Sequence, residues 1–312
     1  MTILACIPGE KRGDTANAGA ETLMSHAGRL RAEIDARDMI PFIGIYDVFS
    51  ASIAARHYDA LFVSGFGFAA SHYGLPDVGF IAWPDIVDFV QRIRTILPEH
   101  HLLVDIDDGY CDVEVACHVV SMLEKEGASG VVLEDQKRPR RCGHFEGKQL
   151  LDLDDYLEKL DRVLATRRDL VVVARTDATD PDDVARRIRA FVDAGVDAVL
   201  VDGVKNLDII RQLSGEVDCP FVFNQIAGGR SEPCTQTELR GAGVSLVIYS
   251  TPCLFAAQQA MEDAMVQLES HDGRLPLAGP GIVGVHECTD VLDANLARRD
   301  APFADVPVTP LA

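Results

Sequence analysis

The feature of this sequence that most constrains its fold is a junction that recurs along the chain. A helix-like segment ends at a glycine, and a short run rich in Val, Ile and Leu follows, in 124–135, 192–203 and 240–250. Glycine ends a helix in a left-handed turn, and a short apolar run of this kind is typical of a strand buried on both faces. Residues 56–65 have the same shape without the glycine. The repeated unit therefore predicts helices that alternate with parallel strands.

Four further β-rich runs bring the expected strands to eight: 42–45, 102–106, 170–174 and 220–223. Helical segments with one apolar face separate strands at 84–97, 153–166 and 181–194. This alternation predicts an α/β fold, a single (β/α)8 barrel of the TIM type. An open, doubly wound sheet is the alternative. No Gly-x-Gly-x-x-Gly follows the first strand, however, which also disfavours a dinucleotide-dependent oxidoreductase.

The barrel is expected to span residues 26–268. Residues 1–25 resemble a loose N-terminal leader, and residues 269–312 contain Gly, Pro and Asp with one short helix-like piece at 290–299. The sequence leaves open whether this last segment is a tail or an arm that packs on a neighbouring subunit.

Composition excludes several classes of protein. The chain has 29 Lys and Arg against 49 Asp and Glu, a net charge of −20, which disfavours binding to nucleic acid. No apolar run approaches the roughly 18 residues that a membrane span needs, and the first residues lack the pattern of a signal peptide. The eight cysteines form no Cys-x-x-Cys pair, which disfavours a zinc site and a disulfide scaffold. We therefore expect a cytoplasmic protein.

Polar side chains end the expected strands, where a parallel barrel places its chemistry. Carboxylates stand at several of these ends, among them Asp105, Asp107, Glu134 and Asp202. Strand ends are often polar because loops begin there, but several carboxylates on one rim repel each other unless a cation compensates. Asp105 and Asp107 alternate along one strand and so point the same way, and Mg²⁺ needs only one or two carboxylates beside water and substrate. A magnesium site at this rim is predicted.

The segment 133–148 concentrates positive charge in an acidic protein. Its five cations indicate a local site of attraction for a small anionic substrate: Lys137, Arg138, Arg140, Arg141 and Lys148. Cys142 lies between Arg141 and His144, surroundings that are expected to lower the pKa of its thiol. Gly143 gives the loop freedom to close, and Cys142 is the candidate acid, base or nucleophile.

A glycine-rich stretch at 64–79 follows the second expected strand. Backbone N–H groups in such a loop can hold a carboxylate or phosphate, although this signal is weak alone. Asp77, near its end, is either a turn residue or an acid that supports the site.

Taken together, these residues resemble the isocitrate lyase/phosphoenolpyruvate mutase superfamily. The matching stretches occur in order at 44–51, 64–79, 105–110, 133–144, 174–178 and 224–229. The most specific is Arg141-Cys142-Gly143-His144. In this superfamily such a loop marks the carbon–carbon lyases, including isocitrate and methylisocitrate lyases, and it is similar in oxaloacetate hydrolases and carboxyphosphonoenolpyruvate mutases.

The resemblance implies both an assembly and a site. The last barrel helix would be swapped between subunits of a homodimer or homotetramer. Mg²⁺, or Mn²⁺ in its place, would be held through three carboxylates: Asp105, Asp107 and Glu134. The substrate would contact Ser64, Gly65, Gly67, Asp77, Gly143, Arg175 and Asn224. Cys142 would be the general acid/base on a mobile loop, with Arg141 and His144 beside it, and Tyr46 would help to move a hydroxyl proton.

The implied activity is Mg²⁺-dependent cleavage of a 2-hydroxy di- or tricarboxylate, methylisocitrate-like, into an α-keto acid and a second acid. Many relatives carry Glu, Glu, Pro and Gly where this chain has Asp202, Ala227, Ser250 and Cys111. These departures favour an alternative, an enzyme of phosphonate metabolism that is either a mutase or a lyase of a phosphono-acid. A non-catalytic binding protein is a third reading, which the intact site residues disfavour.

Overall fold

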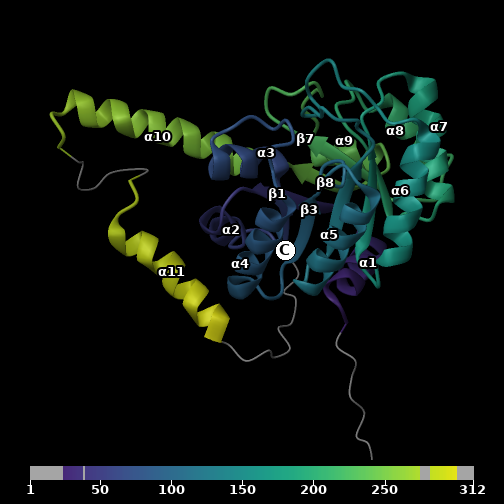
Figure 1. Cartoon of the computed structure of the whole chain (residues 1–312). Helices are drawn as coiled ribbons and strands as arrows, with labels where there is room; N and C mark the ends of the chain where they lie inside the picture. The colour runs from purple at the N-terminus through teal and green to yellow at the C-terminus, as the bar shows by residue number, and fades with distance from the viewer. Residues whose placement is uncertain (1–23, 38, 275–281, 301–312) are drawn as a thin grey trace, which may run out of the picture.

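Eight parallel strands form a closed barrel in chain order, with β8 returning to pair with β1 (Figure 1). The computed structural model describes residues 24–37, 39–274 and 282–300. The predicted (β/α)8 barrel of the α/β class is confirmed, and the open sheet is wrong because the sheet closes. The strands are β1 (Ile40–Ile45), β2 (Ala60–Val63), β3 (His101–Asp105), β4 (Gly130–Glu134), β5 (Val171–Thr176), β6 (Ala198–Val201), β7 (Phe221–Gln225) and β8 (Val244–Tyr249).

Helices that connect the strands surround the barrel on its outer side, and further helices precede β1 and follow β8. They are α1 (His26–Ala36), α2 (Val48–Ala54), α3 (Gly65–Phe68), the π-helical η1 (Ala69–Tyr73), α4 (Trp83–Ile96), α5 (Val113–Lys125), α6 (Leu153–Thr166), α7 (Pro181–Asp193), α8 (Asp208–Ser214), α9 (Gln236–Gly241), α10 (Pro252–Ser270) and α11 (Val285–Asp300). The three helices expected from sequence periodicity are found as α4, α6 and α7.

The apolar residues form two clusters, as the alternation of side chains along buried strands requires. One cluster fills the barrel interior, with Phe42, Leu103 and Val173 among its members. Leu30 of α1 belongs to the same interior cluster and is fully buried, so α1 contributes an apolar side chain to the interior of the barrel. The other cluster lies between the strands and the surrounding helices. The interior cluster lies beneath the end of the barrel at which the strands finish in polar residues.

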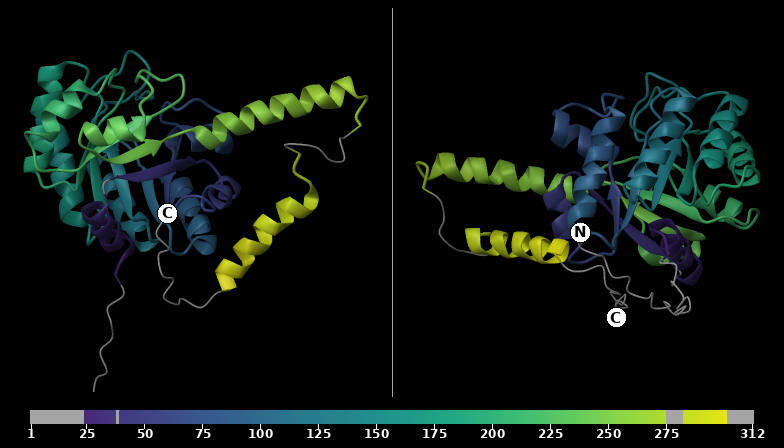
Figure 2. Two further views of the ribbon diagram at one scale, coloured as in Figure 1. Left: turned by 180° about the vertical axis from the view of Figure 1, so that it is seen from behind. Right: turned by 60° about the horizontal axis from the view of Figure 1, so that its bottom comes forward.

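The C-terminal helices depart from this pattern. Helix α10 follows β8, projects away from the barrel and has no buried residue (Figures 1 and 2). The expected barrel boundary at residue 268 falls inside this helix. Helix α11 is longer than the helix-like piece at 290–299; it contacts α4 and α2, and Asn295 Nδ2 donates to Ser52 Oγ over 2.8 Å. In the described part of the chain, no helix combines the length and the apolarity needed to cross a membrane.

The expected leader lies largely outside the described residues, and the expected tail lies partly outside them. Of residues 1–25, only Met24 and Ser25 are described, and Ser25 accepts the Gly28 amide as the N-cap of α1. Of residues 269–312, the stretches 275–281 and 301–312 are not described.

The approach of β1 to the end of β8 generates a stability prediction. A Cβ on Gly44 would lie 1.9 Å from the backbone oxygen of Ser250. Gly44→Ala is therefore expected to lower the free energy of unfolding by about 3 kcal/mol or more, because neither strand can move without disturbing the barrel. Gly241→Ala is the matched control, since nothing lies within 4 Å of a Cβ there. Urea unfolding measures both, and equal effects of the two changes would contradict this account.

Candidate active site

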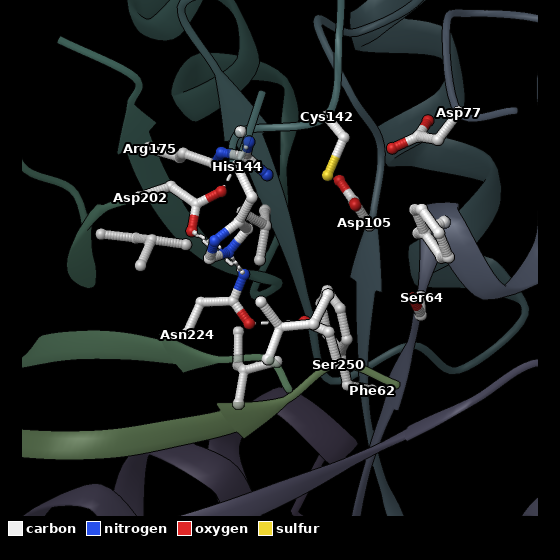
Figure 3. A pocket seen from close by; sticks show the side chains of 16 residues that line it. Phe62, Ser64, Asp77, Asp105, Cys142, His144, Arg175, Asp202, Asn224 and Ser250 are labelled. Carbon is white, nitrogen blue, oxygen red and sulfur yellow. Dashed lines mark hydrogen bonds and ion pairs between the residues drawn. The ribbon is translucent and has the colours of Figure 1, made fainter. Parts of the chain in front are cut away.

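A small cavity opens at the end of the barrel where the strands finish (Figure 3). Its polar lining residues are Ser64, Asp77, Asp105, Cys142, Gly143, His144, Arg175, Asp202, Asn224 and Ser250. Its apolar lining residues are Phe62, Phe66, Val132, Leu200, Ile226 and Ile248. Eight of the residues predicted from sequence therefore meet in one cavity: Ser64, Asp77, Asp105, Cys142, Gly143, His144, Arg175 and Asn224.

One buried guanidinium organises the acidic side of the site. Arg140 is 1% exposed and forms ion pairs with three carboxylates from different parts of the chain. Its Nε donates to Glu134 Oε1 over 2.7 Å, its Nη2 lies 3.2 Å from Asp107 Oδ1, and its Nη1 pairs with Asp77. Arg140 therefore offsets part of the charge of these three carboxylates from within the protein.

The expectation that five cations of the segment 133–148 attract substrate together is corrected by these pairings. Besides Arg140, the Arg138 guanidinium holds the Asp108 carboxylate in a bidentate pair with bonds of 2.8 and 2.9 Å. Lys148 Nζ lies 2.9 Å from Asp177 Oδ1. Three of the five cations are thus committed to carboxylates of the same chain, because in the folded chain carboxylates distant in sequence lie beside them.

Asp105 and Asp107 have the surroundings of cation ligands. Both oxygens of Asp107 are buried and lack a hydrogen-bond partner. Burial raises the pKa of Asp107 well above its usual range and also raises that of Asp105, against the opposing effect of Arg140. A Cβ on Gly65 would lie only 3.0 Å from Asp105 Oδ2, so Gly65 leaves room for close approach to the carboxylate.

These residues fit Mg²⁺. A buried carboxylate with unsatisfied oxygens is stabilised by a cation, and Mg²⁺ is commonly held by one or two carboxylates with water and substrate. Among the described residues, no group of three or more His, Cys, Asp or Glu side chains is placed to hold a metal ion. Glu134 is engaged by Arg140 and lies 3.2 Å from Arg175 Nη2, and burial raises its pKa to about 7.

On the opposite side of the cavity, donors and acceptors form a continuous network. Arg175 Nη2 lies 2.8 Å from Asp202 Oδ2, and Asn224 Nδ2 donates to Asp202 Oδ1 over 3.0 Å. The Ser250 hydroxyl donates to Asn224 Oδ1, which fixes the orientation of the amide. Arg175 Nε also donates to Asp177 Oδ2 over 3.0 Å. The sequence pointed to Arg175 and Asn224, whereas Ser250 was noted only as a departure from the family pattern.

The β4–α6 loop, residues 135–152, closes over the cavity at Gly143. A Cβ at this position would lie 2.0 Å from Asp202 Oδ2 and 2.5 Å from Arg175 Nη2, so only glycine fits here. The Arg230 amide donates to His144 Nδ1 over 3.0 Å, which places the proton of the neutral ring on Nε2, facing Asp202 at 3.7 Å. Burial lowers the pKa of His144, so the ring is neutral at pH 7.

Cys142 lies on this loop with its sulfur inside the cavity (Figure 3). The expectation of a lowered thiol pKa is wrong. Burial raises the pKa of Cys142 to about 12, and the carboxylates of Asp77 and Asp202 act in the same direction. Arg141, which motivated the expectation, is exposed and does not line the cavity. The thiol is therefore protonated at neutral pH, as a proton donor must be.

Four predicted residues lie outside the cavity lining but close to it. Glu134 and Asp107 connect to it through Arg140, and Gly65 adjoins Asp105. A Cβ on Gly67 would lie 3.0 Å from Tyr46 Cβ.

Tyr46 lines two neighbouring cavities instead, and burial raises the pKa of its phenol. The structure therefore does not bring Tyr46 or Arg141 to the thiol. The sequence does not reveal the importance of Arg140. The one indication it contains is that several carboxylates expected on one rim need a positive charge beside them.

Comparisons with known proteins agree with this barrel. The family model for phosphoenolpyruvate phosphomutase matches residues 30–269. The 2-methylisocitrate lyase of Bacillus subtilis (strain 168) is 31% identical over 251 residues, which cover 78% of this chain and 82% of the relative. The crystal structure of 2,3-dimethylmalate lyase aligns with a TM-score of 0.81 at 27% identity, covering 88% of this chain and 94% of the other.

Oxaloacetate acetylhydrolase, solved with the inhibitor 3,3-difluorooxalacetate, aligns with a TM-score of 0.82 at 29% identity, covering 88% of this chain and 95% of the other. These relatives are named for reactions of small acids. From the barrel, the site and the match over residues 30–269, we conclude that the chain belongs to the phosphoenolpyruvate mutase/isocitrate lyase superfamily.

Proposed function

We propose that this protein is a Mg²⁺-dependent lyase that cleaves the C2–C3 bond of a small 2-hydroxy di- or tricarboxylate, of the methylisocitrate type. The observation that carries the proposal is the meeting of a protonated thiol, Cys142, with Asp105 and Arg175 in one small cavity. The apolar walls leave space for a compact substrate only, and the polar groups match an acid with more than one carboxylate.

Binding would follow from the charges that line the cavity. Arg175 and Asn224 offer donors to a carboxylate of the substrate, and Ser64, whose Oγ accepts the Gly67 amide over 3.1 Å, lines the same cavity. Contacts of substrate with Gly65 and Gly67 stay predictions. Asp105 and Asp107 would hold Mg²⁺, with Glu134 and Asp77 supporting its water ligands. When bound, Mg²⁺ supplies Lewis-acid polarisation of the substrate hydroxyl and its neighbouring carboxylate.

The carbon–carbon cleavage balances with groups of this chain. The substrate hydroxyl gives up its proton to Glu134, whose pKa of about 7 suits a base at neutral pH. The C2–C3 bond then breaks to leave a carbonyl, and the electron pair moves to the departing acid as an enolate-like group. The Cys142 thiol then delivers its proton to that carbon, and Arg175, which favours the thiolate, lies in the same cavity. The β4–α6 loop keeps water from the carbanion. The part of Tyr46 in moving the hydroxyl proton stays a prediction, because its side chain would have to reach the cavity and burial raises the pKa of its phenol.

Two of the departures from the family pattern, Ala227 and Asp202, do not make the cavity suited to a more anionic substrate. Ala227 is exposed and does not line the cavity, so the missing carboxylate there leaves the cavity charge unaltered. Asp202 does line it, but its charge is paired with Arg175 at 2.8 Å. A carboxylate substrate is therefore favoured, and a phosphono-acid becomes an outcome that the assay distinguishes.

We also propose that α10 packs onto a second copy of the chain, in a homodimer or in a tetramer built from such dimers. A groove of about 550 Å³ runs between α2 and the start of α10, lined by Ile43, Phe49, Ile53 and other side chains. Met261, Met265 and Val266 of α10 are 57–60% exposed, which is unusual for large apolar residues on one helix. The unpartnered helix and the apolar groove complement one another.

The lyase proposal predicts a Mg²⁺-dependent release of an α-keto acid. Methylisocitrate, dimethylmalate and citramalate should yield pyruvate, detected through NADH loss with lactate dehydrogenase, and EDTA should abolish the signal. Cys142→Ala should reduce kcat by about 10²–10⁴-fold, because the carbanion loses its proton donor. Cys219→Ala is the matched control, since burial raises the pKa of that thiol to about 12 as well, away from the cavity.

If a folded, Mg²⁺-loaded protein releases no α-keto acid from any of these carboxylate substrates, the lyase proposal is contradicted. Turnover of phosphonopyruvate or a related phosphono-acid in ³¹P NMR, under the same conditions, would establish the alternative activity.

The raised pKa of Cys142 predicts the pH dependence of its alkylation. A thiol whose pKa is about 12 gains thiolate about tenfold per pH unit throughout the range from pH 7 to 10. Iodoacetamide labelling at Cys142, followed by peptide mass spectrometry, should therefore rise across this range without a plateau. A plateau near pH 7 would indicate the lowered pKa that neighbouring Arg141 suggests, and would remove the basis for a resting proton donor.

The proposed assembly predicts that charge on α10 separates the subunits. Met265→Asp combined with Val266→Asp should reduce the mass measured by light scattering to that of a smaller species. Gln267→Asp, on another face of the same exposed helix, should leave the mass unchanged. A wild-type chain that is monomeric at micromolar concentration would contradict the assembly proposal.

A further inference from the structure

The β3–α5 turn, residues 106–112, contains three residues other than glycine in the left-handed region. Asp107, Tyr110 and Cys111 have φ values of 51°, 63° and 85°, and Gly109 between them has 76°. Side chains other than glycine rarely adopt the left-handed region, and such residues persist only where their surroundings enforce it. Three of them in one turn therefore require an external restraint, and the turn carries the proposed metal ligand Asp107.

The restraint comes from α6, the helix that contacts α5. Lys159 of α6 is 4% exposed, and its Nζ donates to the backbone oxygen of Asp108 over 2.8 Å and to that of Cys111 over 3.4 Å. The two bonds bracket the left-handed residues Gly109 and Tyr110, and the first of them holds the residue that directly follows Asp107. A buried ammonium is costly unless its protons are satisfied, and these two carbonyl oxygens supply the hydrogen bonds.

We propose that Lys159 is the positioning residue that holds the β3–α5 turn in its left-handed conformation and thereby aims Asp107 at the cation. Asp105 belongs to β3 and is positioned by the sheet, whereas Asp107 lies beyond the last residue of that strand. The direction of its side chain therefore depends on the turn, in addition to the Arg140 guanidinium, whose Nη2 lies 3.2 Å from Asp107 Oδ1. This proposal rests on the proposed metal site and concerns how the chain orients Asp107, one of its two carboxylates.

Other contacts hold different parts of the turn and do not replace Lys159. Arg138 binds the Asp108 side chain, and the Glu134 backbone N–H donates to the backbone oxygen of Asp107 over 2.9 Å. Asp112 accepts the Glu114 amide as the N-cap of α5. Among the described residues, Lys159 is the one whose side chain bridges the backbone of the turn at two points.

The test compares Lys159→Met with wild type. Methionine keeps most of the buried volume and removes the donors. Mn²⁺ affinity of the full chain, followed by the EPR signal of free Mn²⁺, should fall about 10- to 100-fold, as expected when a ligand loses its support. Lys159→Arg, which keeps donors, should recover part of the affinity. Lys125→Met, on the exposed end of α5, is the matched control and should bind as wild type does.

A second change separates strain from simple loss of packing. In the Lys159→Met background, Cys111→Gly should restore much of the Mn²⁺ affinity, because glycine adopts a φ of 85° without restraint. A purely structural defect in the packing of α6 would not respond to this change. The double variant also keeps the test possible if Lys159→Met alone does not fold.

Amide hydrogen exchange in metal-free protein supplies a readout that needs no cation. Exchange at residues 107–112 should be faster in Lys159→Met than in wild type. Wild-type Mn²⁺ affinity in a folded Lys159→Met variant, with unchanged exchange in the turn, would overturn the inference and leave the metal site intact. A wild-type chain that binds no Mn²⁺ would instead contradict the proposed metal site, and the exchange data would still decide the role of Lys159.

Discussion

The site depends on the burial of Arg140 among carboxylates. Asp77, Asp107 and Glu134 come from three separate segments, and without a cation between them their charges would drive the segments apart. Removing one partner of a buried ion pair typically costs about 3–5 kcal/mol, because the remaining charges stay buried without compensation. Arg140 belongs to the β4–α6 loop that carries Cys142, so the same guanidinium joins the acidic centre to the loop bearing the thiol.

A second arginine plays the corresponding part on the other side of the cavity. Arg175 balances Asp177 and Asp202, and together with Lys148 it lowers the pKa of Asp177 to about 2, although burial alone would raise it. Asp107 differs from these carboxylates because its two oxygens have no hydrogen-bond partner. The protein thus satisfies most of its buried acids itself and leaves one side of the acidic cluster suited to a divalent cation.

The sequence predicted most of the barrel because its signals are local. Short apolar runs after a glycine identify buried strands, and the strand ends place Asp105, Arg175 and Asn224 on one rim. The errors concern contacts between distant segments. The thiol pKa of Cys142 was judged from its neighbours in sequence, whereas burial and the carboxylates of Asp77 and Asp202 determine it in the fold.

Long side chains escape sequence analysis for the same reason. Arg140 reaches inward and Lys159 reaches across to another loop, and nothing in their local sequence distinguishes them from cations on the surface. The departure of α10 from the barrel is equally hidden, because the sequence of a helix does not state which surface will cover it.

The proposed function requires that this cavity bind a small dicarboxylate together with a divalent cation. Oxalate is a suitable probe, since its adjacent carboxylates chelate a cation and resemble the charge of an enolate-like product. Isothermal titration should give oxalate binding in the presence of Mg²⁺ and a loss of at least about tenfold in affinity with EDTA. Equal affinity with Mg²⁺ and with EDTA would contradict the account, because Arg175 and Asn224 would then bind the anion without any contribution from the acidic centre.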